Sequence, residues 1–206
     1  MDRLAELRTL IASDRQRMRV LDVVRDLGLP DCWVAAGFVR NCVWDHLHGR
    51  ARSPLQRDID VIWFEPTACD AARDAALETA LRGRDGTLAW SVKNQARMHG
   101  RNGDAPYRSA TDAMRYWPET ATAVGVRLDA RGGIEVAAPL GLDDLFDLVV
   151  RPTRRFVDEK HAVYLERVLS KQWGRTWPSL TIRGQSPISG NCPKPGSDPD
   201  FRKLFR

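Results

Sequence analysis

Hydrophobic residues at helical spacing mark the start of the chain. Leu4, Leu7 and Ile11 recur every three or four positions, as on one face of an amphipathic helix, and a second run of this kind follows Asp14. A glycine and a proline then end the pattern. We therefore predict a pair of N-terminal helices over residues 1–30, packed on the rest of the chain.

Short hydrophobic runs further along the chain have the composition of β-strands. Residues 32–36, 58–64 and 88–93 are rich in β-branched and aromatic residues. Helical patterns lie between them, one over 38–48 and another ending at Arg82. Strands that alternate with helices are typical of α/β or α+β domains rather than helical bundles or sandwiches.

The second half of the chain predicts a hairpin followed by helices. Residues 124–128 and 134–137 flank a glycine-containing turn, which favours two antiparallel strands. We predict helices over 142–150 and 158–173. The polar stretch 95–107 is expected to form a loop at the rim of the sheet.

These patterns predict an α+β fold, in which an antiparallel or mixed sheet is flanked by helices. A length of 206 residues suits one ordinary domain with a complete core. We divide the chain into the helical pair 1–30, a core over 31–157, a C-terminal helix and extension over 158–182, and a mobile basic tail over 183–206.

Charge and hydropathy restrict the partners. The formal net charge is +5, but from residue 183 onward five Lys and Arg oppose two Asp, which leaves +2 for the body and argues against a dedicated nucleic-acid groove. No apolar run approaches the roughly 18–20 residues of a membrane-spanning helix, and no signal peptide is evident. We expect a cytoplasmic protein without a membrane partner, whose four cysteines are thiols.

An Asp-x-Asp pattern starts the second predicted strand. Asp58 and Asp60 point to the same face, with Cα atoms about 6.6 Å apart, so both carboxylates can bind one divalent ion or a close pair of ions. Mg²⁺ binds one or two carboxylates together with phosphates and water, and the two carboxylates repel unless a cation lies between them. Alternatively, one Asp caps the strand and the other pairs with Arg52 or Arg57.

A second candidate element lies about twenty residues upstream. Gly37 ends a buried strand and opens a helix that carries Arg40 and Asn41. Backbone N–H groups at a helix start and a guanidinium both attract phosphate. Together with the Asp pair, this element suits one nucleotide.

These segments resemble the nucleotidyltransferase fold of the DNA polymerase beta superfamily, in particular tRNA CCA-adding enzymes and poly(A) polymerases. More specifically, the chain resembles a bacterial family of nucleotidyltransferase-like proteins over roughly residues 20–182. The segments that carry the resemblance are Gly37-Phe-Val-Arg-Asn41, Asp58-Ile-Asp-Val61, Val92-Lys-Asn-Gln-Ala-Arg-Met-His99, Asn102-Gly-Asp-Ala-Pro-Tyr107, Trp117-Pro-Glu-Thr-Ala-Thr-Ala123 and Gly141-Leu-Asp-Asp-Leu-Phe146.

The resemblance implies an enzyme that moves a nucleoside monophosphate from an NTP to an acceptor and releases pyrophosphate. Asp58 and Asp60 would bind Mg²⁺ or Mn²⁺, while Gly37, its helix and Arg40 would hold the phosphates. The acceptor is a small molecule, a protein side chain or an RNA end. The alternative is a catalytically silent protein of the same fold that binds a nucleotide or a partner.

The chain departs from the superfamily pattern at the third carboxylate, which commonly lies on the next strand. Asn94 follows that strand here, and an amide can ligate a metal but cannot accept a proton at neutral pH. Asp104 or Glu135 could replace the acid, and we take Asp104 as a candidate catalytic residue. Asn41 stands where CCA-type enzymes carry an acid.

Further cations lie beside the predicted site. Lys93 and Arg97 are expected to neutralise triphosphate charge, although a solvated loop face would have the same composition. His46 and His48 point to opposite sides of a helix and do not predict a zinc site. The candidate nucleotide-binding residues are Gly37, Arg40, Asn41, Lys93, Asn94 and Arg97.

Overall fold

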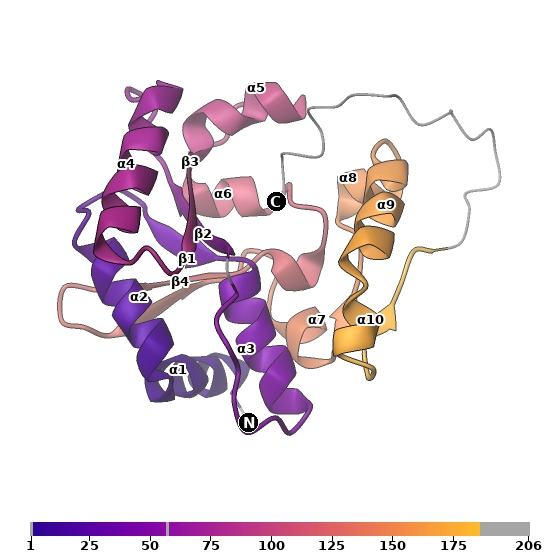
Figure 1. The fold of residues 1–206 in the computed structure, drawn as a ribbon. Coiled ribbons are helices and arrows are strands. Elements are labelled where there is room, and N and C mark those ends of the chain that lie inside the picture. Colours follow the sequence, from indigo (N-terminus) through magenta and orange to yellow (C-terminus); the bar gives the residue numbers. More distant parts are fainter. Residues whose placement is uncertain (1, 57, 186–206) are drawn as a thin grey trace.

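The structure, a computed structural model, describes residues 2–56 and 58–185. Its N-terminal helices are α1 (Arg3–Ser13) and α2 (Arg15–Arg25), as predicted. The Asp14 side chain caps α2 by accepting hydrogen bonds from the first-turn N–H groups of Gln16 and Arg17. Figure 1 shows these helices beside the sheet, with the C-terminal helices on the other side of the molecule.

The main sheet is mixed and has five strands in the order β3-β2-β1-β4-β5. β2 and β3 are parallel, whereas the other neighbouring strands are antiparallel. The predicted α+β fold with a mixed sheet is thus confirmed, including the hairpin. The strands are β1 (Trp33–Ala35), β2 (Asp58–Trp63), β3 (Ala89–Asn94), β4 (Gly125–Leu128) and β5 (Ile134–Ala137).

Helices cover the sheet and fill the connections. α3 (Gly37–Leu47) follows β1, and α4 (Ala71–Arg84) packs against β3. The remaining elements are η1 (Gln95–Arg97, a 3₁₀ turn), α5 (Met98–Asn102), α6 (Ala110–Met114), η2 (Thr120–Thr122, a 3₁₀ turn), α7 (Asp143–Phe146), β6 (Val149–Val150), α8 (Arg154–Val157), α9 (His161–Lys171), α10 (Trp173–Thr176) and β7 (Thr181–Ile182).

Local backbone geometry explains where the predicted elements were wrong. The predicted loop 95–107 contains η1 and α5, because Asn94 caps the turn and Gly103, in a left-handed conformation, ends the helix. The predicted helix over 142–150 stops at Phe146, before Leu148 with φ of 56°. The predicted helix over 158–173 begins three residues later and is interrupted at Gln172, where φ is 47°.

One hydrophobic cluster joins the two ends of the described chain. It includes Leu7 from α1, Val61 from β2, Tyr164 from α9 and Trp177 after α10. The helical segments at both ends therefore share a core with the sheet. Every helix of the described residues is too short or too polar to cross a membrane. The predicted basic tail lies outside these residues from position 186 onward.

A buried arginine fixes the entrance to α3. Arg17 donates to the carbonyl oxygen of Phe38 and to the carbonyl and hydroxyl oxygens of Ser53, and it forms an ion pair with Asp14. Because its side chain is only 1% exposed, these contacts are shielded from water. Arg17 thereby ties α2, the first turn of α3 and the segment before β2 together.

The turn between β1 and α3 depends on an unusual backbone conformation. Ala36 has φ of 56° and ψ of −120°, which a residue with a Cβ rarely adopts. Its N–H donates to the carbonyl oxygen of Val124 at 2.9 Å, so the strained residue is held against the sheet. The turn directs α3 away from the end of β1 and places Gly37 next to β2.

We predict that Ala36→Gly stabilises the protein. Glycine adopts positive φ without steric strain, and the expected rise in the free energy of unfolding is about 0.5–1 kcal/mol after its larger unfolded-state entropy is counted. Urea denaturation measures the change. Ala35→Gly, at a buried strand position, is the control and should destabilise by about 1 kcal/mol. Equal losses in both variants would contradict the prediction.

Candidate functional site

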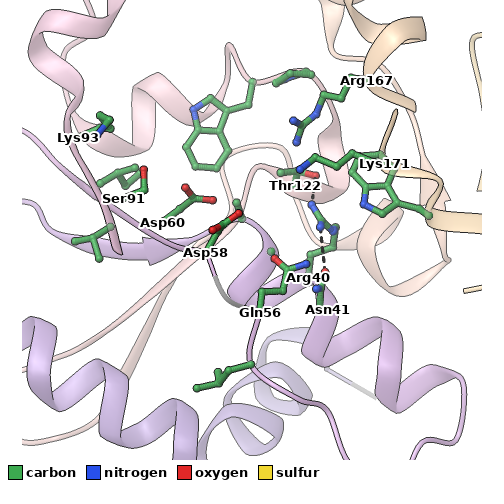
Figure 2. A pocket seen from close by; sticks show the side chains of 18 of the residues that line it. Arg40, Asn41, Gln56, Asp58, Asp60, Ser91, Lys93, Thr122, Arg167 and Lys171 are labelled. Carbon is green, nitrogen blue, oxygen red and sulfur yellow. Dashed lines mark hydrogen bonds between the residues drawn. The ribbon is translucent and has the colours of Figure 1, made fainter. Parts of the chain in front are cut away.

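A cavity of about 420 Å³ lies between the sheet, the start of α3 and the C-terminal helices. Figure 2 shows side chains from these separate segments pointing into it. Its charged lining residues are Arg40, Asp45, Arg50, Asp58, Asp60, Lys93, Arg101, Arg167 and Lys171.

The alternation of β2 turns two carboxylates toward the cavity. Ile59 and Val61 are fully buried in the main hydrophobic cluster, whereas Asp58 and Asp60 lie on the other face of the strand and line the cavity (Figure 2). In the described part of the chain neither carboxylate has an ion-pair partner, so the alternative of a pair with Arg52 is not observed; Arg57, the other partner considered, lies outside the described residues.

The surroundings of Asp60 make its ionisation costly. Burial raises the pKa of Asp60 to about 6, and the neighbouring Asp58 charge acts in the same direction. Arg167, Lys171 and Arg40 oppose this shift. The carboxylate pair therefore lies in a partly buried space where additional positive charge is favourable.

The start of α3 reaches the same cavity through a close backbone contact. A Cβ on Gly37 would lie 2.0 Å from the side-chain oxygen Oε1 of Gln56. With the Gln56 side chain in this position only glycine fits, and the amide comes from the segment that leads into β2. Gly37 and Asn41 both line the cavity.

Arg40 is a buried cation held by aromatic rings. Its guanidinium carbon lies 5.0 Å from the ring centre of Trp44 and 4.8 Å from that of Trp173. It donates to Thr122 Oγ1 and Asn41 Oδ1, each at 3.0 Å. Burial, with Arg167 nearby, lowers the pKa of Arg40 to about 10. Arg40 therefore supplies positive charge at the cavity wall from a fixed position.

The C-terminal helix α9 supplies cations that the sequence analysis did not single out. Arg167 Nε donates to Glu119 Oε1 at 2.6 Å, and Lys171 follows one helical turn later on the same side. Both line the cavity (Figure 2). Desolvation at the cavity and the nearby Arg167 lower the pKa of Lys171. Basic residues four apart on a predicted helix were the available sequence signal.

A hydrogen-bonded carboxylate and edge-to-face indoles hold the C-terminal wall of the cavity, formed by α9, α10 and Trp177, against α3. Asp45 accepts from Trp177 Nε1 at 2.8 Å, and from Arg50 Nη1 and Ser53 Oγ at 2.7 Å each. The rings of Trp44 and Trp177 meet edge to face with centres 5.1 Å apart. These contacts set the distance between α9 and the carboxylate pair.

The structure brings together most of the predicted site residues. Asp58, Asp60 and Lys93 line the cavity together with the α3 residues Gly37, Arg40 and Asn41. Lys93 Nζ also lies 2.7 Å from Glu78 Oε1, which fixes the lysine side chain at the edge of β3.

The structure places Asn94 and Arg97 outside the cavity lining. Asn94 is fully buried, where its side chain accepts from Glu65 and Ala96 N–H groups and donates to carbonyl oxygens. Arg97 forms an ion pair with the buried Asp74. Both residues connect β3 to neighbouring segments instead of facing the carboxylate pair.

The two acids considered as a third carboxylate also lie elsewhere. Asp104 is buried, forms ion pairs with Arg155 and Lys160, and accepts a hydrogen bond from Tyr107. Glu135 pairs with Arg127 across the β4–β5 hairpin. Neither lines the cavity.

The cavity-facing positions of β3 carry no acid. In the parallel register of β2 and β3, Asp60 is paired with Ser91 and Ile62 with Lys93. Ser91 and Lys93 both line the cavity, and Ser91 lies beside Asp60 (Figure 2). A hydroxyl therefore occupies the neighbouring same-face position of the adjacent strand.

The carboxylate pair fits a hard divalent cation. Over 2–56 and 58–185 no cluster of three or more His, Cys, Asp or Glu side chains could enclose a metal ion. Mg²⁺ does not require such a cage, since one or two carboxylates with phosphate and water oxygens complete its coordination. Asp58 and Asp60, open to the cavity and without an ion-pair partner among the residues that the structure describes, provide that donor set.

A nucleotidyltransferase family model matches residues 22–182 of the chain. The chain belongs to this nucleotidyltransferase family. The match spans the carboxylate pair, the start of α3 and the C-terminal wall, so all three parts of the cavity fall within the family domain.

Solved structures with the same fold include CCA-adding enzymes. An NMR structure described as revealing a CCA-adding enzyme head domain is 36% identical, with a TM-score of 0.78 over 87% of this chain and 95% of that chain. A CCA-adding enzyme with CTP and the Thermotoga maritima CCA-adding enzyme with tRNA are 16% and 17% identical, with TM-scores of 0.52 and 0.51.

The latter two comparisons show the fold alone. Each covers 85% of this chain but 42% of the enzyme, so this chain spans less than half the length of those enzymes. No curated protein sequence matches the chain. The family assignment therefore rests on the family model and on the similarity to the head-domain structure.

We predict that Asp60→Asn stabilises the metal-free protein at neutral pH. The pKa of Asp60 rises from 3.8 to about 6 on folding. The free energy of unfolding of the protein therefore falls as the pH rises through that interval. The asparagine variant should gain about 1–2 kcal/mol at pH 7.5 in EDTA, and this gain should disappear at pH 3. Thermal and urea unfolding measure it. Asp22→Asn, at an exposed position, is the control; a pH-independent effect of Asp60→Asn would contradict the prediction.

Proposed function

We propose that the protein transfers a nucleoside monophosphate from an NTP to an acceptor in a divalent-metal-dependent reaction that releases pyrophosphate. The observation that carries this proposal is the convergence of Asp58 and Asp60 with the glycine start of α3 in one cavity lined by cations. Membership of a nucleotidyltransferase family supports it, as do structures of the same fold that contain CTP or an ATP analogue.

Asp58 and Asp60 are the residues that would hold the Mg²⁺ or Mn²⁺ ions. When bound, such ions stabilise the attacking and departing oxygens of the displacement at the α-phosphorus. The raised pKa of Asp60 matches this role, because a cation favours the charged carboxylate that burial disfavours. A ligand that brings a divalent cation would therefore bind beside this carboxylate pair more favourably than one without a cation.

The protein's own contribution is positioning and electrostatic stabilisation. Gly37 has no side chain of its own in front of the N–H groups at the start of α3, so a phosphate that displaces the Gln56 amide could approach them. Arg167 and Lys171 face the carboxylate pair from α9 and would stabilise negative charge on the triphosphate (Figure 2). Since Gly37 lies in the backbone and Arg167 is held by Glu119 before the ligand arrives, these two groups need little reorganisation during reaction.

A catalytically silent nucleotide-binding protein is the second candidate. The serine on β3, where an acid could have faced Asp60, favours it, because no cavity-lining carboxylate in the described chain is left to receive a proton. Incubation with α-labelled NTP and an acceptor mixture separates the two functions. Binding without any transfer of label would favour the silent protein.

Asp58→Asn and Asp60→Asn test the metal assignment. We expect each to weaken Mg²⁺-dependent NTP binding at least about tenfold, because a neutral amide gives up the charge attraction to the cation. Calorimetry with and without Mg²⁺ measures the loss, and circular dichroism checks that the fold is retained. Asp22→Asn serves as the control away from the cavity. Unchanged metal-dependent binding in both variants would refute the assignment.

Gly37→Ala tests phosphate binding at the start of α3. The added methyl group overlaps the Gln56 amide, which must move, and it reduces the space in front of the helix N–H groups. We expect weaker NTP binding, by about tenfold, with smaller effects on stability. The double variant with Gln56→Ala relieves the clash with the amide. Full recovery of NTP binding in the double variant would show that displacement of Gln56, not obstruction of phosphate, caused the loss.

A further inference from the structure

Among the described residues, the cavity offers no free carboxylate or imidazole to remove a proton from an acceptor, and its lysines are assigned to phosphate charge. A hydroxyl acceptor must lose its proton to attack the α-phosphorus. In the proposed function Asp58 and Asp60 are ligands of a cation, and Asp45 already accepts three hydrogen bonds. The described residues that line the cavity include no other acid and no histidine. An acceptor that is already ionised avoids this requirement.

Cations line the cavity on both sides of the carboxylate pair. Figure 2 shows Arg167 and Lys171 from α9 on one side of Asp58 and Asp60, and Lys93 from β3 on the other. Arg101 of α5 adds to the cationic lining. A single anionic ligand on one side of the carboxylate pair would account for the cations on that side only. The cations on the other side indicate a second anionic ligand.

An in-line displacement explains this distribution of charge. The attacking and departing oxygens lie on opposite sides of the phosphorus, so a departing pyrophosphate on one side leaves the other side for the acceptor. The α9 side belongs to the donor, because Arg167 of α9 and Arg40 of α3 lie against the same Trp173 ring, with guanidinium carbons 5.6 and 4.8 Å from its centre. Lys93, which the sequence assigned to the triphosphate, then faces the acceptor instead, held in place by its ion pair with Glu78.

We propose that the acceptor is a phosphate monoester, so that the reaction forms a phosphoanhydride. This inference rests on the proposed function and specifies its acceptor. An ionised oxygen of the monoester attacks the α-phosphorus of the NTP, a new P–O bond forms, and the bond to the β-phosphate oxygen breaks. Pyrophosphate leaves with that electron pair. No proton is transferred, and the charges of NTP and monoester equal those of the anhydride and pyrophosphate.

The proposal is tested with a cell extract divided into two equal parts. One part is treated with bead-bound alkaline phosphatase and the other with the same beads after heat inactivation; the beads are sedimented, and both parts are incubated with the protein, Mg²⁺ and α-labelled NTP. Each part is further separated by ultrafiltration, which distinguishes a small phosphorylated molecule from a phosphate on a macromolecule. We expect label transfer with the untreated part and an at least tenfold loss after phosphatase treatment.

The labelled product provides a second readout. A phosphoanhydride resists alkaline phosphatase and releases labelled nucleoside monophosphate on treatment with a nucleotide pyrophosphatase. Equal transfer with both parts of the extract, or a product that resists the pyrophosphatase, would overturn the monoester proposal while leaving nucleotidyl transfer in place. Absence of transfer with either part would instead overturn the proposed function.

Lys93→Met tests the acceptor side with a matched control. Methionine keeps most of the side-chain volume but removes the charge, so we expect at least tenfold less transfer to the untreated extract with unchanged NTP binding in calorimetry. Arg82 also pairs with Glu78 but does not line the cavity, and Arg82→Gln should alter neither quantity. Weakened NTP binding in Lys93→Met, or equal loss of transfer in both variants, would contradict the assigned role of Lys93.

Discussion

The burial of one of two neighbouring carboxylates on a strand, together with their mutual repulsion, governs the arrangement of the whole site. Asp58 and Asp60 cannot turn away from each other, because the residues that alternate with them are anchored in the hydrophobic cluster. The repulsion has to be balanced from across the cavity, and α9 and α3 bring Arg167, Lys171 and Arg40 into that position. The fold holds these acidic and basic side chains at a separation that leaves room for a ligand between them.

The indole-rich contact between α3 and the C-terminal segment maintains this separation. Arg40 is stacked between Trp44 and Trp173, while Asp45 receives the indole N–H of Trp177. These contacts are buried and polar at the same time, so they define one arrangement instead of several of similar energy. These three tryptophans are buried and support the cavity wall, so they do not form an exposed stacking surface.

Local signals in the sequence predicted the part of the site that lies on β2 and α3. The alternation around Ile59 and the glycine that begins α3 are properties of a few neighbouring residues, and the structure retains both. Asn94 and Asp104 are different, because their surroundings come from distant segments. Asp104, for example, is enclosed by Arg155 and Lys160, whose proximity no local pattern could indicate. Contacts between segments far apart in the sequence determine where these two side chains lie.

The docking of the C-terminal helices has a thermodynamic consequence. The cations on α9 and the carboxylates on β2 belong to segments far apart along the chain, and a bound triphosphate would contact both. Ligand affinity and the attachment of the last helices are therefore linked functions: each must strengthen the other by the same free energy. The fraction of sites that hold ligand therefore also reports how stably α9 and the following residues are attached to the rest of the protein.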